Sequence, residues 1–174
     1  MPATSTAQEV RQRVQEMGAE CAKRRGDQEL LSTRFVRQAR RHPFRFCMTD
    51  DTGRELNYAK ACIGSLAMSR AIARRVGDDE MVGILLPNCI PAALTNVAVT
   101  ILGKATVNLN FTTGPESLDA AIGKCGLRHI FTSRRAIQKL GIAPRAEMVF
   151  LEDFAAAVSR WDRLLSACAF VLFP

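Results

Sequence analysis

The feature that most constrains this chain is an alternation of short apolar runs with helical segments after residue 80. Met81 to Leu86 is apolar without interruption, which is typical of a strand buried on both faces. Shorter strand-like segments follow at 105–109, 129–132 and 147–151, and residues of helical periodicity separate them. Strands separated by helices connect by right-handed crossovers and pair in parallel. The sequence therefore predicts an α/β domain in layers, with a mostly parallel sheet and flanking helices.

A β-hairpin is predicted near residues 44–58, ahead of this alternation. Two strand-like runs flank Asp50-Asp51-Thr52-Gly53, which has the composition of a turn. A helix is expected over 33–41, with Ser32 as its N-cap and Pro43 ending it. Further helices are expected at 59–76, 91–102, 115–124, from Ser133 onward, and at 154–165 or beyond.

The length of 174 residues, with 48% apolar and 24% charged residues, fits roughly one globular domain. We divide it into a basic helical or partly disordered leader, residues 1–31, and an α/β domain, residues 32–174. The formal net charge is +7, and residues 1–45 hold ten Lys and Arg against five Asp and Glu. A basic segment of this kind suits nucleic acid or anionic lipid. No aromatic residues alternate with its arginines, which argues against specific nucleic-acid binding.

The chain shows no signs of secretion or of a membrane span. Its start has no apolar signal region, and no apolar stretch reaches the roughly 20 residues that cross a bilayer. The six cysteines are widely spaced, without a CxxC pair or a nearby histidine that could complete a metal site, so free thiols in a reducing compartment are expected. This predicts a cytoplasmic protein, with peripheral contact to a membrane left open.

The end of the sequence, residues 167–174, is apolar to the last residue. Natural termini are usually polar and frayed. Two hypotheses follow from this segment: the chain is interrupted there, or the segment docks a partner.

No familiar catalytic arrangement occurs in the sequence, which lacks HExxH, GxSxG and GxGxxG. The best local candidate is the segment 110–115, Asn-Phe-Thr-Thr-Gly-Pro, which lies between a strand and a helix. Its amides and hydroxyls can hold an anion, but Thr113 or Gly114 can equally cap the helix that Pro115 begins. A third hypothesis places a small molecule at the carboxyl ends of the strands, near Asn88 and Asn110.

The acidic groups and histidines have structural interpretations. Asp50-Asp51 belongs to the hairpin turn, 78–80 to a solvated loop, and Glu152-Asp153 to the cap of the following helix. His42 and His129 show no partner in the sequence that would orient them. We therefore assign no catalytic, cofactor-binding or metal-binding residue from the sequence.

Five landmarks resemble the adenylate-forming (AMP-binding) acyl ligase superfamily in order and spacing. They are the segments 30–35 (LLSTRF), 50–58 (DDTGRELNY), 82–88 (VGILLPN), 103–110 (GKATVNLN) and 130–133 (IFTS). Further segments are similar to the acyl-[acyl-carrier-protein] synthetase part of bacterial 2-acylglycerophosphoethanolamine acyltransferases. These are 111–114, 125–128 and 148–153.

The resemblance implies a partial version of the ligase large domain, with ATP and Mg²⁺ as cofactors of the full-length family. It also implies partners: the remainder of the ligase, an acyl carrier or an acyl group. The family's phosphate loop (T-S-G-T-T-G-x-P-K), its acidic ribose-binding residue and its C-terminal lysine have no counterpart here. Residues 112–116 imitate part of the loop, but they come too early and lack the closing lysine.

The leading hypothesis is therefore an N-terminal fragment of an AMP-forming acyl-CoA or acyl-carrier-protein synthetase, inactive alone, whose family activates fatty acids and transfers acyl groups to phospholipids. The alternative is a non-catalytic interaction module. In that case the basic leader 1–31 and the apolar tail 167–174 would dock a protein or an anionic membrane.

Overall fold

A computed structural model of the chain describes residues 9, 12, 13, 15–17, 30–110, 112 and 114–172, except for the side chains of 155–157. The chain divides into two compact units, Met1–Leu30 and Leu31–Pro174. In the first unit residues 9, 12, 13 and 15–17 are helical and Leu30 is not, and residues 1–8, 10, 11, 14 and 18–29 of the predicted leader lie outside the described residues. The second unit contains the fold described below.

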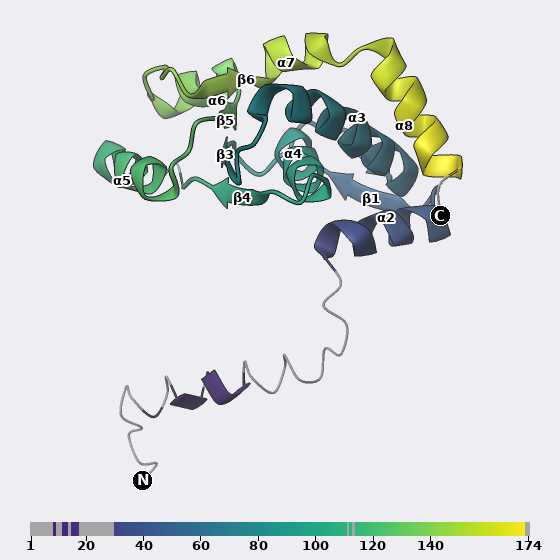
Figure 1. Cartoon of the computed structure of the whole chain (residues 1–174), viewed down its shortest axis with the longest axis horizontal. Coiled ribbons are helices and arrows are strands. Elements are labelled where there is room, and N and C mark those ends of the chain that lie inside the picture. The colour runs from purple at the N-terminus through teal and green to yellow at the C-terminus, as the bar shows by residue number, and fades with distance from the viewer. Residues whose placement is uncertain are drawn as a thin grey trace. The chain divides into compact units, whose positions relative to one another are not determined.

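A parallel sheet of four strands forms the centre of the second unit (Figure 1). Its strands are β3 (Met81–Leu85), β4 (Ala105–Asn108), β5 (Ile130–Thr132) and β6 (Met148–Phe150). Their order across the sheet is β4-β3-β5-β6, so β3 pairs with both β4 and β5. This confirms the predicted α/β class and the parallel sheet.

Helices cover both faces of this sheet. One apolar core joins it to α3 (Tyr58–Val76), α4 (Ile90–Ile101) and α7 (Leu151–Ala157). A second core on the opposite face joins it to α5 (Pro115–Cys125) and α6 (Arg134–Leu140). Neighbouring side chains of a strand alternate between the two cores: Phe131 belongs to the first and Ile130 to the second. Both residues are fully buried, as the apolar runs in the sequence predict.

The predicted hairpin is present as β1 (Phe46–Thr49) and β2 (Glu55–Asn57), paired antiparallel in a separate sheet. It packs with α2 (Leu31–Arg41) and the starts of α3 and α4 in a third, smaller core. The predicted N-cap role of Ser32 is wrong, because α2 already begins at Leu31. The Ser32 hydroxyl instead donates to the carbonyl oxygen of Thr100, at 3.4 Å.

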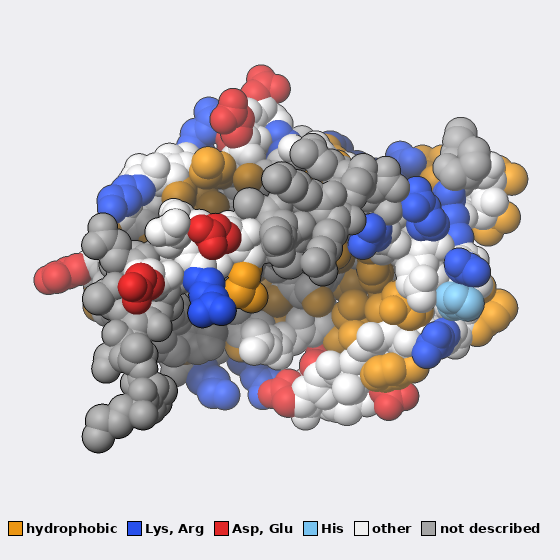
Figure 2. Space-filling view, turned by 90° about the horizontal axis from the view of Figure 1, so that it is seen from below, with side chains coloured by type: hydrophobic (Ala, Val, Ile, Leu, Met, Phe, Trp, Pro, Cys, Tyr) orange, Lys and Arg blue, Asp and Glu red, His pale blue; other side chains and the backbone are white. Residues whose placement is uncertain are grey.

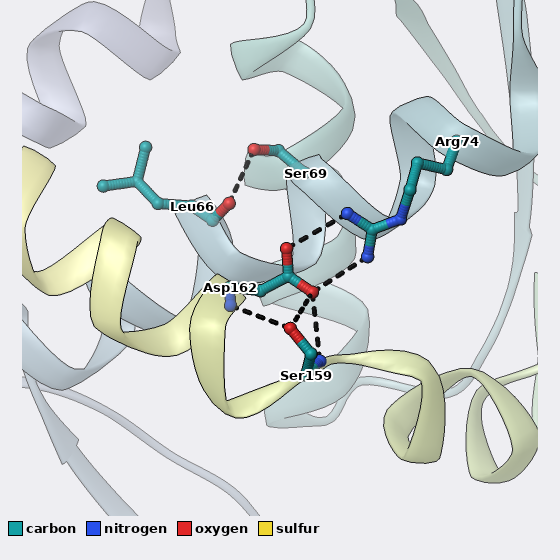
Figure 3. A network of polar contacts seen from close by, with 5 residues as sticks. All are labelled: Leu66, Ser69, Arg74, Ser159 and Asp162. Atoms are coloured by element: carbon teal, nitrogen blue, oxygen red, sulfur yellow. Dashed lines mark hydrogen bonds and ion pairs between the residues drawn. The ribbon is translucent and has the colours of Figure 1, made fainter.

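The last predicted helix is two helices in the structure, because the backbone at Val158 is extended. The second of them, α8 (Arg160–Leu172), begins with a reciprocal cap. The Asp162 amide donates to Ser159 Oγ, and Ser159 donates its amide and hydroxyl to Asp162 Oδ2, all within 3.0 Å (Figure 3). Arg74 of α3 donates two hydrogen bonds, of 3.0 and 2.9 Å, to the same carboxylate.

An ordinary surface helix buries apolar side chains and exposes polar ones, but α8 buries polar side chains and exposes several apolar ones. Its buried residues are polar, Asp162 and Ser166, and they lie on the side that packs against α3. Its exposed side carries Trp161, Leu164 and Leu165, which are 71%, 53% and 47% exposed. At the other end of α8, Arg40 of α2 donates hydrogen bonds to the carbonyl oxygens of Ala169 and Phe170. No helix in the described part of the chain is both long enough and apolar enough to span a membrane.

Candidate functional site

An open groove of about 600 Å³ lies at the carboxyl ends of β3 and β4. It forms there because the chain leaves the two strands in opposite directions: β3 leads to α4 on one face of the sheet, and β4 leads to α5 on the other. Asn88 and Asn110, which the sequence places at this crevice, both line the groove. The hairpin contributes Met48 and Thr49 to its wall.

One carboxylate ties the hairpin to the groove. Asp50 Oδ1 accepts hydrogen bonds from the amide and hydroxyl of Thr52, as expected for the turn. Its other oxygen, Oδ2, accepts the amide hydrogen of Ile90 at 3.3 Å, at the first residue of α4. The hydrogen bond from the Thr52 hydroxyl is the main cause that lowers the pKa of Asp50. Asp50 is therefore ionised near neutral pH. Its negative charge interacts favourably with the positive N-terminal end of the α4 dipole.

A pair of amides braces α4 against β4 inside the groove. Asn96 Nδ2 donates to Asn108 Oδ1, and Asn108 Nδ2 donates to Asn96 Oδ1, both at 3.0 Å. Asn96 also donates to the carbonyl oxygen of Ala92, which fixes the orientation of its amide. This reciprocal pairing holds two uncharged polar groups in place on the groove wall.

No acidic or basic side chain is among the described residues that line the groove. Its one ionisable group is Cys89, whose thiol pKa is raised by burial, so the side chain stays a neutral thiol at physiological pH. The remaining lining side chains are aliphatic or amide, apart from the thioether of Met48 and the hydroxyl of Thr49. Such a surface suits the uncharged part of a small molecule, and it offers no group for proton transfer near neutral pH.

The candidate anion segment is a turn followed by a helix cap. Asn110 Oδ1 accepts hydrogen bonds from the amide and the hydroxyl of Thr112, at 2.9 and 2.8 Å. Gly114 is the N-cap of α5, and Pro115 occupies its first turn, which confirms the cap interpretation for Gly114. Phe111 and Thr113 lie outside the described residues.

The described residues do not fit the phosphates of ATP or a bound Mg²⁺. The Thr112 hydroxyl is already engaged, and Lys104 Nζ binds the carbonyl oxygens of Gly77 and Asp79, at 2.7 and 2.6 Å, near the other end of the sheet. In the part of the chain that the structure describes, no group of three acidic, His or Cys side chains is placed to hold a metal ion.

One expectation for the amino end of the sheet is wrong. Asp79 does not lie in a solvated loop; it is only 5% exposed. His129 Nδ1 lies 2.7 Å from Asp79 Oδ2, and Arg128 forms an ion pair with Oδ1. Burial raises the pKa of Asp79, but the hydrogen bond from His129 and the charge of Arg128 outweigh it, so the pKa is lowered. This cluster and His42 are absent from the described lining of the groove.

The other acidic pair also acts differently from the prediction. Glu152 and Asp153 lie in the first turn of α7, but their hydrogen bonds go to Arg134 at the start of α6. Glu152 accepts the backbone amide, and Asp153 accepts two bonds from the guanidinium, at 2.8 and 2.6 Å. The pair therefore fixes the start of α6 rather than capping the helix to which it belongs.

Comparisons with known proteins agree with this architecture. The model of a family described as "AMP-binding enzyme" matches residues 35–162. Among solved structures, the N-terminal subdomain of Klebsiella oxytoca NpsA in complex with 3-hydroxyanthranilyl-AMSN superposes with a TM-score of 0.64 at 14% identity, covering 75% of this chain and 33% of that chain. The crystal structure of VinN gives a TM-score of 0.67 at 19% identity, covering 79% and 37%.

A third similar structure is the nonribosomal peptide synthetase FmoA3 in its alpha-methyl-L-serine-AMP bound form. It gives a TM-score of 0.61 at 18% identity, covering 71% of this chain and 14% of that chain. The present chain thus spans about a third of the length of NpsA's N-terminal subdomain and of VinN. At these identities the likeness concerns the fold.

Proposed function

This chain belongs to the AMP-binding enzyme family, and from that premise we propose that it supplies the first part of the large domain of a ligase that activates a carboxylic acid as an acyl adenylate. In this proposal the groove at the carboxyl ends of β3 and β4 forms one wall of the site for the acid. The neutral lining of the groove carries the proposal, because the unreactive part of an acid substrate needs a surface without competing charges.

The acid we propose is a fatty acid, and the acceptor is the thiol of an acyl carrier. The aliphatic groups of Met48, Ile84 and Leu86 line the groove and suit an alkyl chain. The similarity of residues 111–114 and 125–128 to acyl-[acyl-carrier-protein] synthetases supports the same choice. The paired amides of Asn96 and Asn108 would limit how deep an alkyl chain can lie, since an apolar group gains nothing by displacing their mutual hydrogen bonds.

The groups that would hold ATP are not among the described residues. In a complete ligase ATP would supply the adenylyl group that the carboxylate takes up, with pyrophosphate as the leaving group, and Mg²⁺ would neutralise the charge of the phosphates. The residues of this chain would shape the acid site and exclude water from it. We expect no ATP–pyrophosphate exchange from the chain alone. Clear exchange in the presence of decanoate would mean that the described residues do hold ATP, and it would contradict the proposal.

Binding of the acid can be tested separately from turnover. Titration of the ¹⁵N-labelled chain with decanoate should shift amide resonances of residues 84–96, whereas ATP should leave them unchanged. Ala93 lines the groove, so Ala93→Trp should reduce these shifts by filling it. Ala120 is exposed on α5 and is absent from the described lining, which makes Ala120→Trp a matched control that should bind normally.

Each outcome of this titration is informative. Shifts at the groove that Ala93→Trp removes and Ala120→Trp preserves would support an acid-binding wall. Shifts confined to other residues, or equal shifts in both variants, would contradict it. Shifts from ATP at the groove would mean that nucleotide, rather than acid, occupies this part of the family's site.

A further inference from the structure

The basic charge of the chain is more localised than the division into a leader and a domain suggests. Residues 1–30 contain five Lys and Arg and also five Asp and Glu, so they have no net surplus. Residues 31–45 contain five arginines and no acidic residue. The surplus therefore belongs to α2 and to the segment that follows it, both of which the structure describes.

The inner and outer sides of α2 differ in chemistry. Ala39 is fully buried, and the Phe35 ring packs near that of Tyr58, with 6.0 Å between ring centroids. Arg34, Arg37 and Arg41 are exposed and recur at helical spacing along the outward side. The inward residues pack α2 against the domain, and the outward side carries the exposed arginines.

Two aromatic side chains extend into solvent directly after this helix. Phe44 is 87% exposed and Phe46 is 56% exposed. The backbone beneath them is held by hydrogen bonds from Ala59 N–H to the Pro43 carbonyl, at 2.9 Å, and from Tyr58 N–H to the Arg45 carbonyl, at 3.1 Å. The two phenylalanines therefore stand on a fixed backbone instead of a loose loop, and they bury little surface within the domain.

Arg34, Arg37, Arg41, Phe44, Arg45 and Phe46 together are called the α2 surface here. In Figure 2, Lys and Arg side chains alternate with hydrophobic ones around a histidine on the right of the view. Arg40 extends this surface, because its bonds to α8 bring that helix's last turn next to α2. That turn adds the exposed side chains of Val171 and Leu172.

We propose that the α2 surface binds the surface of an anionic lipid bilayer. The expectation that no aromatic residues alternate with these arginines is wrong, because the exposed Phe44 and Phe46 flank Arg45. Such a surface matches the two layers of a bilayer, because guanidinium groups pair with lipid phosphates while aromatic rings enter the interface below them. The absence of acidic residues from 31–45 leaves nothing in that stretch to repel an anionic headgroup. The inference goes beyond acid activation and does not depend on the groove.

Flotation of the full chain with large unilamellar vesicles tests this proposal. We expect binding to vesicles of phosphatidylcholine with 30 mol% phosphatidylglycerol and little binding to phosphatidylcholine alone. Each arginine contributes about fivefold to the partition coefficient, so Arg41→Gln with Arg45→Gln should lower it about 25-fold. Phe44→Ser with Phe46→Ser should lower it by roughly tenfold per residue and remove the part of the binding that survives 0.5 M NaCl.

The matched control has the same change of net charge elsewhere. Arg75→Gln with Arg135→Gln alters two exposed arginines on α3 and α6 and should change the partition coefficient less than twofold. Equal losses in the control and the α2 variant would show that net charge alone drives binding and would overturn the proposal. Absence of binding to anionic vesicles, with capture of soluble polyglutamate by the same two arginines, would identify an acidic protein as the partner instead.

Folding of the variants is checked independently. All four substituted residues of the α2 surface are exposed, so their urea unfolding midpoints should equal that of the unmodified chain. A variant that binds less while unfolding normally supports the proposal. Binding that persists unchanged in the correctly folded α2 variants would overturn it.

Discussion

At the scale of single residues, the start of α8 depends on one carboxylate. Asp162 is 6% exposed and accepts hydrogen bonds from Arg74 and Ser159. The hydrogen bond from Arg74 is the largest cause that holds the pKa of Asp162 well below its usual range. A carboxyl whose pKa is lower in the folded than in the unfolded chain stabilises the fold above the unfolded pKa of about 3.9. That stabilisation is lost as the pH falls below it.

Asp162→Asn tests this contribution. The amide keeps the shape of the side chain but loses the ionic bonds to Arg74, so the free energy of unfolding should fall by about 1–2 kcal/mol at pH 7. The difference from the unmodified chain should shrink at pH 3, where the unfolded carboxyl gains its proton. Urea unfolding at both pH values measures it, with exposed Asp78→Asn as the control. A difference that is the same at both pH values would contradict the ionic origin.

At the scale of elements, the pairing of β3 with β5 depends on a glycine. A Cβ atom at Gly83 would lie 2.9 Å from Ile130 Cγ1 and 3.1 Å from Leu127 Cδ1, closer than carbon atoms pack. Gly83→Ala should therefore lower the free energy of unfolding by about 1–3 kcal/mol. Gly123 lies within α5 with open space around it, so Gly123→Ala should raise it by about 0.5–1 kcal/mol. Urea titrations measure the free energy of unfolding of both variants. Equal effects of Gly83→Ala and Gly123→Ala would refute the steric argument.

Elements of regular structure could be predicted from the sequence because their signals are local. The apolar run 81–86 corresponds to β3, and the helix expected at 59–76 is α3, which begins one residue earlier. The break between α7 and α8 could not be seen from periodicity, since apolar residues continue through it. Its signal is the Ser159–Asp162 cap, which competes with a longer helix.

The candidate site was predictable in its place but not in its detail. The rule for parallel sheets puts a crevice at the carboxyl ends of the strands, near Asn88 and Asn110, and the groove lies there. The bond from Ile90 to Asp50 joins residues 40 positions apart, and the Asp79–His129 contact joins residues 50 apart. Such contacts exist only after the elements have packed, so a local pattern in the sequence carries no record of them.

At the scale of the whole molecule, the exposed apolar side of α8 predicts that copies of the chain associate with one another. Trp161, Leu164 and Leu165 form an apolar row that contributes little to the domain's own core. Replacing all three by Gln should change the free energy of unfolding by less than about 1 kcal/mol, as for surface substitutions. The same change should lower the apparent mass at high concentration in sedimentation equilibrium. A large loss of stability would mean that the row is packed in solution.

The contact of Arg40 with the end of α8 has a consequence for biosynthesis. The guanidinium and the Phe170 carbonyl that it binds are 130 positions apart in the chain. A ribosome adding about 5–20 residues per second needs roughly 6–26 s to cover that distance. α2 therefore waits about that long for this contact, and it can be joined to α8 only after the sheet and helices that lie between them in the chain have been synthesised.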